Sequence, residues 1–281
     1  MVLRHAARSL ALLALIALAA LAAGACAGAK QAEVPAAGHY AHLRGIRVYY
    51  ELYGKGPALV LLHGGAGSGA QFEKQVPFFA QHFRVIVPDA CAQGRTTDRP
   101  GPLTYHEMAE DVRALLDHLH VQRADLMGWS DGGVEALDLA MRNPTRVGRV
   151  VTLGANYRAD GLNAPDIAWN QTARAQDFGD DMRRFYDSVA PDSTHYEVAM
   201  NKVIELWRTE PQYSEADLAK IQSRVLVVAG EHDVVRRDHT EALAKTIPHA
   251  TLWIVPGASH SVMQEQPDLV NRRVLEFLKQ P

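Results

Sequence analysis

Seven short β-rich runs alternate with helical patterns along most of the chain, and this alternation limits the fold more than any other feature. Neighbouring parallel strands need a crossover connection, and a helix packed on the sheet usually supplies it. The sequence therefore predicts an α/β fold with a mostly parallel sheet flanked by helices. The predicted strands are Val48 to Leu52, Ala58 to Leu62, Arg84 to Val87, Ala124 to Gly128, Val147 to Leu153, Val225 to Ala229 and Thr251 to Val255.

Residues 157–219 interrupt this alternation. They contain helical patches without a convincing strand, and twelve acids against six bases give them a net charge of −6. We interpret them as a helical insertion into a core formed by residues 39–156 and 220–281. Their acidity has two explanations, a solvated helical face or a field that favours a cationic substrate.

Composition excludes several classes of protein. A chain of 281 residues with 47% hydrophobic content can bury a full core. Its formal net charge is −3, so no nucleic-acid partner is expected. The two cysteines, Cys26 and Cys91, cannot form a disulfide scaffold or a four-thiolate metal site.

Residues 1–25 have the layout of an export signal. Two arginines precede the uncharged run Leu10 to Ala23, whose length of about 21 Å is short of a bilayer core of about 30 Å. Cys26 resembles the lipidated cysteine of a bacterial lipobox, and ordinary cleavage before it is the alternative. We expect export to the cell envelope or secretion, residues 26–38 as a tether, and membrane contact only through a lipid anchor on Cys26.

The segment Gly128-Trp129-Ser130-Asp131-Gly132 lies between a predicted strand and a helical pattern. This is the Gly-x-Ser-x-Gly pattern of a nucleophile elbow, which projects the serine hydroxyl above the sheet. Glycines at both ends allow the strand and the helix to approach closely. Ser130 is therefore the predicted nucleophile.

A serine nucleophile needs a base that a third group holds in place. Asp233 and His260 each follow a predicted strand, so all three side chains are expected at the same edge of the sheet. Glu231 is an alternative acid, and His232, His63 and Ser259 are further candidates because they lie in similar polar loops. The chain order Ser130, Asp233, His260 favours this set as the catalytic triad.

The loop His63-Gly64-Gly65-Ala66-Gly67 follows the strand that ends at Leu62. We expect the backbone amides of Gly65 and Asp131 to form an oxyanion hole, and His63 to shape its loop rather than to exchange protons. Gly64, Trp129 and Asp131 are predicted to contact the substrate. No histidine spacing typical of a metal site and no phosphate-binding loop is present, so we expect no metal and no cofactor.

These motifs resemble the α/β-hydrolase superfamily over nearly all of residues 40–281. The resemblance implies an eight-stranded sheet, one strand more than the runs above, and residues 157–219 as a cap over the active site. The sequences Gly128-Trp129-Ser130-Asp131-Gly132-Gly133 and Gly154-Ala155-Asn156-Tyr157 further resemble valacyclovirase-like (biphenyl hydrolase-like) esterases. Epoxide hydrolases and haloalkane dehalogenases resemble the fold but use Asp where this chain has Ser130.

This resemblance bears on the roles of Asp131 and of position 91. The acid after the nucleophile is associated in those esterases with the α-amino group of the substrate, and Asp131 occupies the matching position; a carboxylate at the N-terminus of a helix is the other explanation. Many relatives have Asp-x-Arg-Gly-x-Gly where this chain has Asp89-Ala90-Cys91-Ala92-Gln93-Gly94. The structural pairing of that arginine is either lost or supplied by Arg95.

The sequence thus predicts an exported serine hydrolase that cleaves a small carboxylic ester, thioester or lactone through an acyl-enzyme, with an α-amino-acid ester as one candidate substrate. A carbon–carbon bond hydrolase or an aminopeptidase of the same fold is an alternative, because one fold carries many reactions. A non-catalytic protein that captures a ligand in the same pocket is the alternative from a different class.

Overall fold

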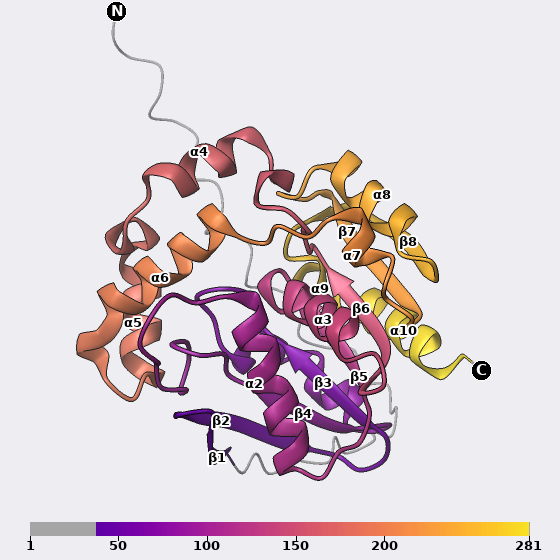
Figure 1. Cartoon of the computed structure of the whole chain (residues 1–281), viewed down its shortest axis with the longest axis horizontal. Helices are drawn as coiled ribbons and strands as arrows, with labels where there is room; N and C mark the ends of the chain where they lie inside the picture. The colour runs from indigo at the N-terminus through magenta and orange to yellow at the C-terminus, as the bar shows by residue number, and fades with distance from the viewer. Residues whose placement is uncertain (1–37, 281) are drawn as a thin grey trace, which may run out of the picture. The chain divides into compact units, whose positions relative to one another are not determined.

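The computed structural model describes residues 38–280 (Figure 1). Two predicted segments lie outside the described residues: the signal segment 1–25, and residues 26–37 of the tether, which include Cys26. Gly38, predicted as the last residue of the tether, is the first residue of a strand.

Eight strands form one sheet in the order β1-β2-β4-β3-β5-β6-β7-β8. The strands β1 and β2 pair antiparallel to each other, β2 pairs antiparallel to β4, and every other neighbouring pair is parallel. The predicted mostly parallel sheet is therefore confirmed. Its strands are β1 Gly38–Leu43, β2 Ile46–Tyr53, β3 Ala58–Leu62, β4 Arg84–Pro88, β5 Ala124–Trp129, β6 Val147–Leu153, β7 Val225–His232 and β8 Ala250–Ser259.

The strand that the runs did not reveal is β1. Its sequence, Gly-His-Tyr-Ala-His-Leu, has few aliphatic side chains, and Ala41 is the one buried residue of this strand. An edge strand pairs on one side only, so it can form with a weak hydrophobic pattern when its neighbour holds it. The register of β1 on β2 runs from Gly38 opposite Glu51 to Leu43 opposite Ile46.

Alternate residues of the parallel strands enter two separate cores. Val60, Leu126 and Val150 belong to the core on the side of α2, α3 and α8. Leu59, Met127 and Val151 belong to the core on the side of α1 and α10. Helices on both faces explain why these strands are almost continuously apolar. The helices are α1 Val76–Phe79, α2 Tyr105–His118, α3 Asp131–Arg142, α8 Arg237–Thr246, α9 Val262–Glu265 and α10 Pro267–Lys279.

Thr104 caps the N-terminus of α2. The Thr104 hydroxyl accepts a hydrogen bond from the Glu107 backbone N–H at 3.0 Å. The Glu107 carboxylate does not complete the capping box, because it pairs with Arg44 and Arg99 instead. Ion pairing with two guanidinium groups thus replaces the second hydrogen bond of the box.

Between β6 and β7 the chain forms helices, and Figure 1 shows α4, α5 and α6 beyond the end of the sheet where α3 begins. The α-helices are α4 Ala164–Thr172, α5 Gly179–Val189, α6 Tyr196–Thr209 and α7 Glu215–Leu218, joined by short 3-10 turns at Ala159–Gly161, Ala175–Phe178 and Ser193–His195. We call residues 157–219 the helical insertion.

Candidate active site

The turn between β5 and α3 holds Ser130 in a backbone conformation that non-glycine residues seldom adopt, with φ 52° and ψ −119°. The glycines on either side are required by close approaches. A Cβ on Gly128 would lie 2.1 Å from the Gly132 carbonyl oxygen, and one on Gly132 would lie 2.1 Å from the Leu62 carbonyl oxygen. The elbow predicted from the sequence is therefore present in its geometry.

The structure brings Ser130, His260 and Asp233 together although they are far apart in the sequence. The Ser130 Oγ lies 3.0 Å from His260 Nε2, and His260 Nδ1 lies 2.7 Å from Asp233 Oδ1. These distances suit transfer of the serine proton to the imidazole.

Asp233, and not its neighbour Glu231, contacts the histidine. The Asp233 carboxylate is buried and also accepts hydrogen bonds from the backbone N–H groups of Val235 and Gly230. The Glu231 side chain is exposed and accepts from the Gly257 backbone N–H. Fixed donors hold Asp233 in place, so it can orient the His260 ring.

Gly154, directly after β6, belongs to this site, although the sequence did not identify it as a site residue. Its φ is +63°, and a Cβ there would lie 2.7 Å from His260 Nδ1 and 3.1 Å from Asp233 Oδ2. Only a glycine leaves space for the contact between the imidazole and the carboxylate. The signal in the sequence was a glycine directly after a predicted strand, which is too common to be decisive.

The backbone N–H groups of Gly65 and Asp131 donate no hydrogen bond within residues 38–280. A Cβ on Gly65 would lie 2.3 Å from Asp131 Oδ2, so the Gly65 loop and the start of α3 are in close contact. Two neighbouring amides without partners beside a serine nucleophile are the components that an oxyanion hole requires. Their role remains a prediction.

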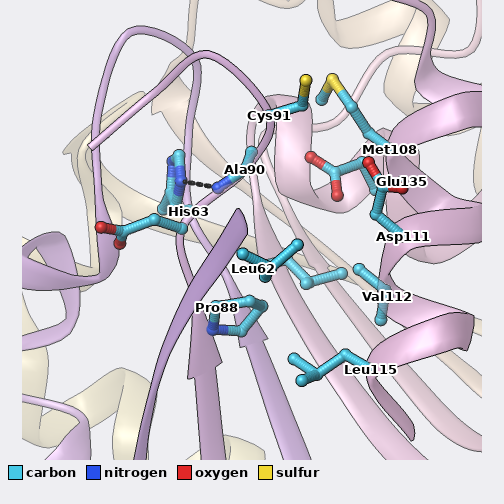
Figure 2. Close-up of a pocket in the computed structure, with 12 residues that line it drawn as sticks. Leu62, His63, Pro88, Ala90, Cys91, Met108, Asp111, Val112, Leu115 and Glu135 are labelled. Atoms are coloured by element: carbon cyan, nitrogen blue, oxygen red, sulfur yellow. Dashed lines mark hydrogen bonds between the residues drawn. The ribbon is translucent and has the colours of Figure 1, made fainter. Parts of the chain in front are cut away.

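The hydrogen bonds of the His63 ring connect two loops, and neither of them involves a residue of the triad. The Ala90 backbone N–H donates to His63 Nε2 at 2.9 Å (Figure 2), and His63 Nδ1 lies 2.8 Å from the Gly64 carbonyl oxygen. With Nε2 as the acceptor, Nδ1 is the ring nitrogen that donates to the Gly64 carbonyl oxygen. Both nitrogens are occupied, in agreement with the expectation that His63 shapes its loop.

A cavity of about 200 Å³ lies beside the Ser130 hydroxyl. The core and the helical insertion both contribute to its wall. Its lining residues are Tyr105, Ser130, Asp131, Gly154, Asn156, Leu162, Asp166, Trp169, Asn170, Trp207, Glu210, Val234, Val235 and His260. We call it the active-site pocket.

Asp131 lines this pocket, but its carboxylate already has protein partners. The Trp207 indole Nε1 lies 3.0 Å from Asp131 Oδ1 and 2.9 Å from Oδ2, and the Tyr105 hydroxyl donates to Oδ1 at 3.0 Å. Burial raises the pKa of Asp131 above its ordinary value, and these hydrogen bonds offset only part of that rise. The side chain therefore joins the elbow to α6, an interaction that neither explanation from the sequence included.

Trp129 and Gly64 differ from their predicted role, because neither lines the active-site pocket. The Trp129 indole donates a hydrogen bond to the His260 carbonyl oxygen at 2.9 Å. A Cβ on Gly64 would lie 3.0 Å from the Trp129 ring. Both residues thus lie beside the triad, and their contact with the substrate stays a prediction.

The residues of the helical insertion that line the pocket were not assigned from the sequence. Trp169 and Trp207 come from α4 and α6, and their ring centroids are 6.3 Å apart. Glu210 follows α6 and accepts from the Tyr105 backbone N–H, and burial raises its pKa. The concentration of aromatic residues in the insertion was the available signal, but it did not identify which of them face the nucleophile.

Arg95 contacts Asp89, the first residue of the segment in which Cys91 stands. Its guanidinium lies 3.6 Å from the Asp89 carboxylate, and its backbone N–H donates to the same oxygen at 2.8 Å. Cys91 is buried, and burial raises the pKa of its thiol to about 11. A thiol with such a pKa is a poor nucleophile at neutral pH.

Within residues 38–280, no three side chains of His, Cys, Asp or Glu are placed so that they could share a metal ion. No helix in that range combines the length and the apolar character needed to cross a membrane.

The sheet, the elbow after β5 and the pocket above it define an α/β hydrolase. The family model of the alpha/beta hydrolase fold matches residues 57–195. The chain therefore has the α/β-hydrolase fold.

Three known proteins show the range of its relatives. The serine hydrolase BPHL of Mus musculus is 28% identical, over 84% of each chain. The 2-hydroxy-6-oxo-6-phenylhexa-2,4-dienoate hydrolase of Burkholderia cepacia is 26% identical, over 84% of this chain and 92% of its own. The solved structure of Est816, described as an N-acyl homoserine lactone degrading enzyme, is 28% identical with a TM-score of 0.71, over 85% of this chain and all of its own.

Proposed function

We propose that this protein is a serine hydrolase that cleaves a small carboxylic ester, thioester or lactone through an acyl-enzyme. The observation that carries the proposal is the pair of contacts from His260, 3.0 Å to the Ser130 hydroxyl and 2.7 Å to the Asp233 carboxylate, beside a cavity of about 200 Å³. The similarity to a serine hydrolase and to a lactone-degrading enzyme supports the same reaction type.

In the proposed reaction Ser130 Oγ attacks the carbonyl carbon, and its proton passes to His260 Nε2. The carbonyl electrons move to oxygen, where the amides of Gly65 and Asp131 stabilise the negative charge. Collapse of this intermediate breaks the bond to the alcohol or thiol, which leaves with the proton from His260. Water then attacks the acyl-enzyme with His260 as base, and the acid is released.

The charge of the pocket favours an ester over the substrate of a carbon–carbon bond hydrolase. Its lining includes three carboxylates, Asp131, Asp166 and Glu210, and no lysine or arginine. A dienoate, which the relative from Burkholderia cepacia hydrolyses according to its name, carries a carboxylate of its own. Without a cationic partner, burying another anion there is unfavourable.

The proposal is tested by covalent labelling with a fluorophosphonate and by turnover of a neutral 4-nitrophenyl ester. Ser130→Ala should abolish labelling and lower kcat/KM by roughly 10⁴-fold or more, because the nucleophile is gone. Ser188→Ala, at an exposed serine of α5, is the matched control and should behave like the wild type. A folded wild-type protein whose Ser130 does not react would favour the non-catalytic ligand-binding alternative instead.

A further inference from the structure

The first helix of the insertion, α4, presents one polar face to the active-site pocket. Asp166, Trp169 and Asn170 all line the cavity, and their spacing of three and four residues places them on the same side of a helix. The nucleophile belongs to the core, at the start of α3. This face can therefore contact a part of the substrate other than the reacting carbonyl.

Two polar side chains on this face have no protein partner. Asn170 is only 6% exposed, yet its side-chain amide forms no hydrogen bond within residues 38–280. The Asp166 carboxylate has neither a hydrogen bond nor an ion pair in that range. Both side chains line the cavity and no protein group pairs with them, so their polar atoms are free to bind a polar ligand there.

The surroundings of this face suit a cation. Trp169 is 37% exposed and lies in an aromatic cluster, with ring centroids 5.5 Å from Phe178 and 6.3 Å from Trp207. Aromatic faces next to a carboxylate attract ammonium groups. The lining has no lysine or arginine that could neutralise Asp166, and the insertion as a whole carries a net charge of −6.

We propose that α4 holds an ammonium group of the substrate, with Asp166 as the counter-ion, Asn170 as hydrogen-bond acceptor and the Trp169 ring as the apolar contact. This inference rests on the proposed ester hydrolysis and names the substrate class. It places the cation on α4, away from Asp131, whose carboxylate is occupied by Trp207 and Tyr105.

A structural role for Asp166 predicts a different outcome. The residue lies in the first turn of α4, where a carboxylate stabilises the helix dipole. Loss of that interaction would lower Tm and would affect charged and neutral substrates equally. The ratio of kcat/KM between matched esters is therefore the decisive measurement.

Two pairs of esters differ only in charge: acetylcholine with 3,3-dimethylbutyl acetate, and methyl 6-aminohexanoate with methyl heptanoate. In the wild type at least one cationic ester should exceed its neutral partner by about tenfold or more in kcat/KM, and Asp166→Asn should reduce that preference to about parity. Asp180→Asn is the matched control, since it removes the same charge from an exposed position of the insertion outside the pocket. Its preference should equal that of the wild type.

Equal or higher turnover of the neutral esters by the wild type would overturn the inference and leave the proposed hydrolase intact. Preference lost in Asp131→Asn and kept in Asp166→Asn would also overturn it, because the cation would then lie at Asp131. If Ser130 is unreactive, calorimetric binding to the wild type still decides: choline should bind more tightly than 3,3-dimethylbutan-1-ol, and Asp166→Asn should remove that difference.

Discussion

Gly154 determines how closely His260 and Asp233 approach each other. We predict that Gly154→Ala lowers kcat/KM by about 100-fold, because its Cβ would occupy the space of the imidazole and misplace the base. Gly257→Ala is the matched control: its φ of +69° imposes a similar backbone strain, but a Cβ there has no neighbour within 4 Å. Steady-state kinetics and Tm of both variants separate the two effects. A fully active Gly154→Ala would contradict the role.

Glu135 is a buried carboxyl group on α3 that takes no part in the proposed reaction. It lines a small cavity together with Asp111 and Cys91 (Figure 2), and it has no hydrogen-bond partner within residues 38–280. Burial, and after it the charges of Asp131 and Asp111, raise its pKa well above the ordinary value. The folded protein therefore holds the proton of Glu135 to a higher pH than the unfolded chain does.

This proton makes stability depend on pH. The comparison is with a protein whose side chain at position 135 is always neutral. Relative to it, the wild type has its full stability below the pKa of glutamate in the unfolded chain. As pH rises from that value towards the raised pKa of the folded protein, the wild type loses stability. We predict that Glu135→Gln stabilises the protein by about 1 kcal/mol or more at pH 8 and has a smaller effect at pH 4. Thermal unfolding at both values checks this, with the exposed Glu73→Gln as control. A pH-independent difference would exclude a protonated Glu135.

At the scale of elements, the insertion and the core meet at the elbow. The α6 helix supplies Trp207 to Asp131, the residue directly after the nucleophile. Lys202, also on α6, pairs with Asp98 in the loop before α2. The sequence identified the elbow from its glycines and the insertion from its change of pattern, but no local pattern encodes a contact between residues 76 positions apart.

The same limit applies to the elements themselves. Strands with continuous apolar runs, such as β3 and β5, were predictable because both of their faces are covered by helices. The β1 strand was not, because its pairing with β2 depends on the neighbouring strand more than on its own side chains.

At the scale of the whole molecule, export and lipidation remain predictions. We expect protein made in a bacterial host to carry a lipid on Cys26 and to partition into the detergent phase, and Cys26→Ser to be found in the aqueous phase. Cys91→Ser is the matched control, since the Cys91 thiol is buried in the core. Intact-mass measurement decides: an unmodified chain that begins at residue 26 would establish ordinary cleavage.

The sequence by itself determined the α/β fold, the elbow at Ser130 and the order in which the acid and the base follow it. These features depend on local periodicity and on glycines beside a strand end, which a single chain displays directly. Tertiary structure decided the rest: that Asp233 rather than Glu231 faces His260, that Gly154 leaves room for both, and that Asp131 is bound to Trp207. These facts depend on distances between separate elements, and packing alone sets those distances.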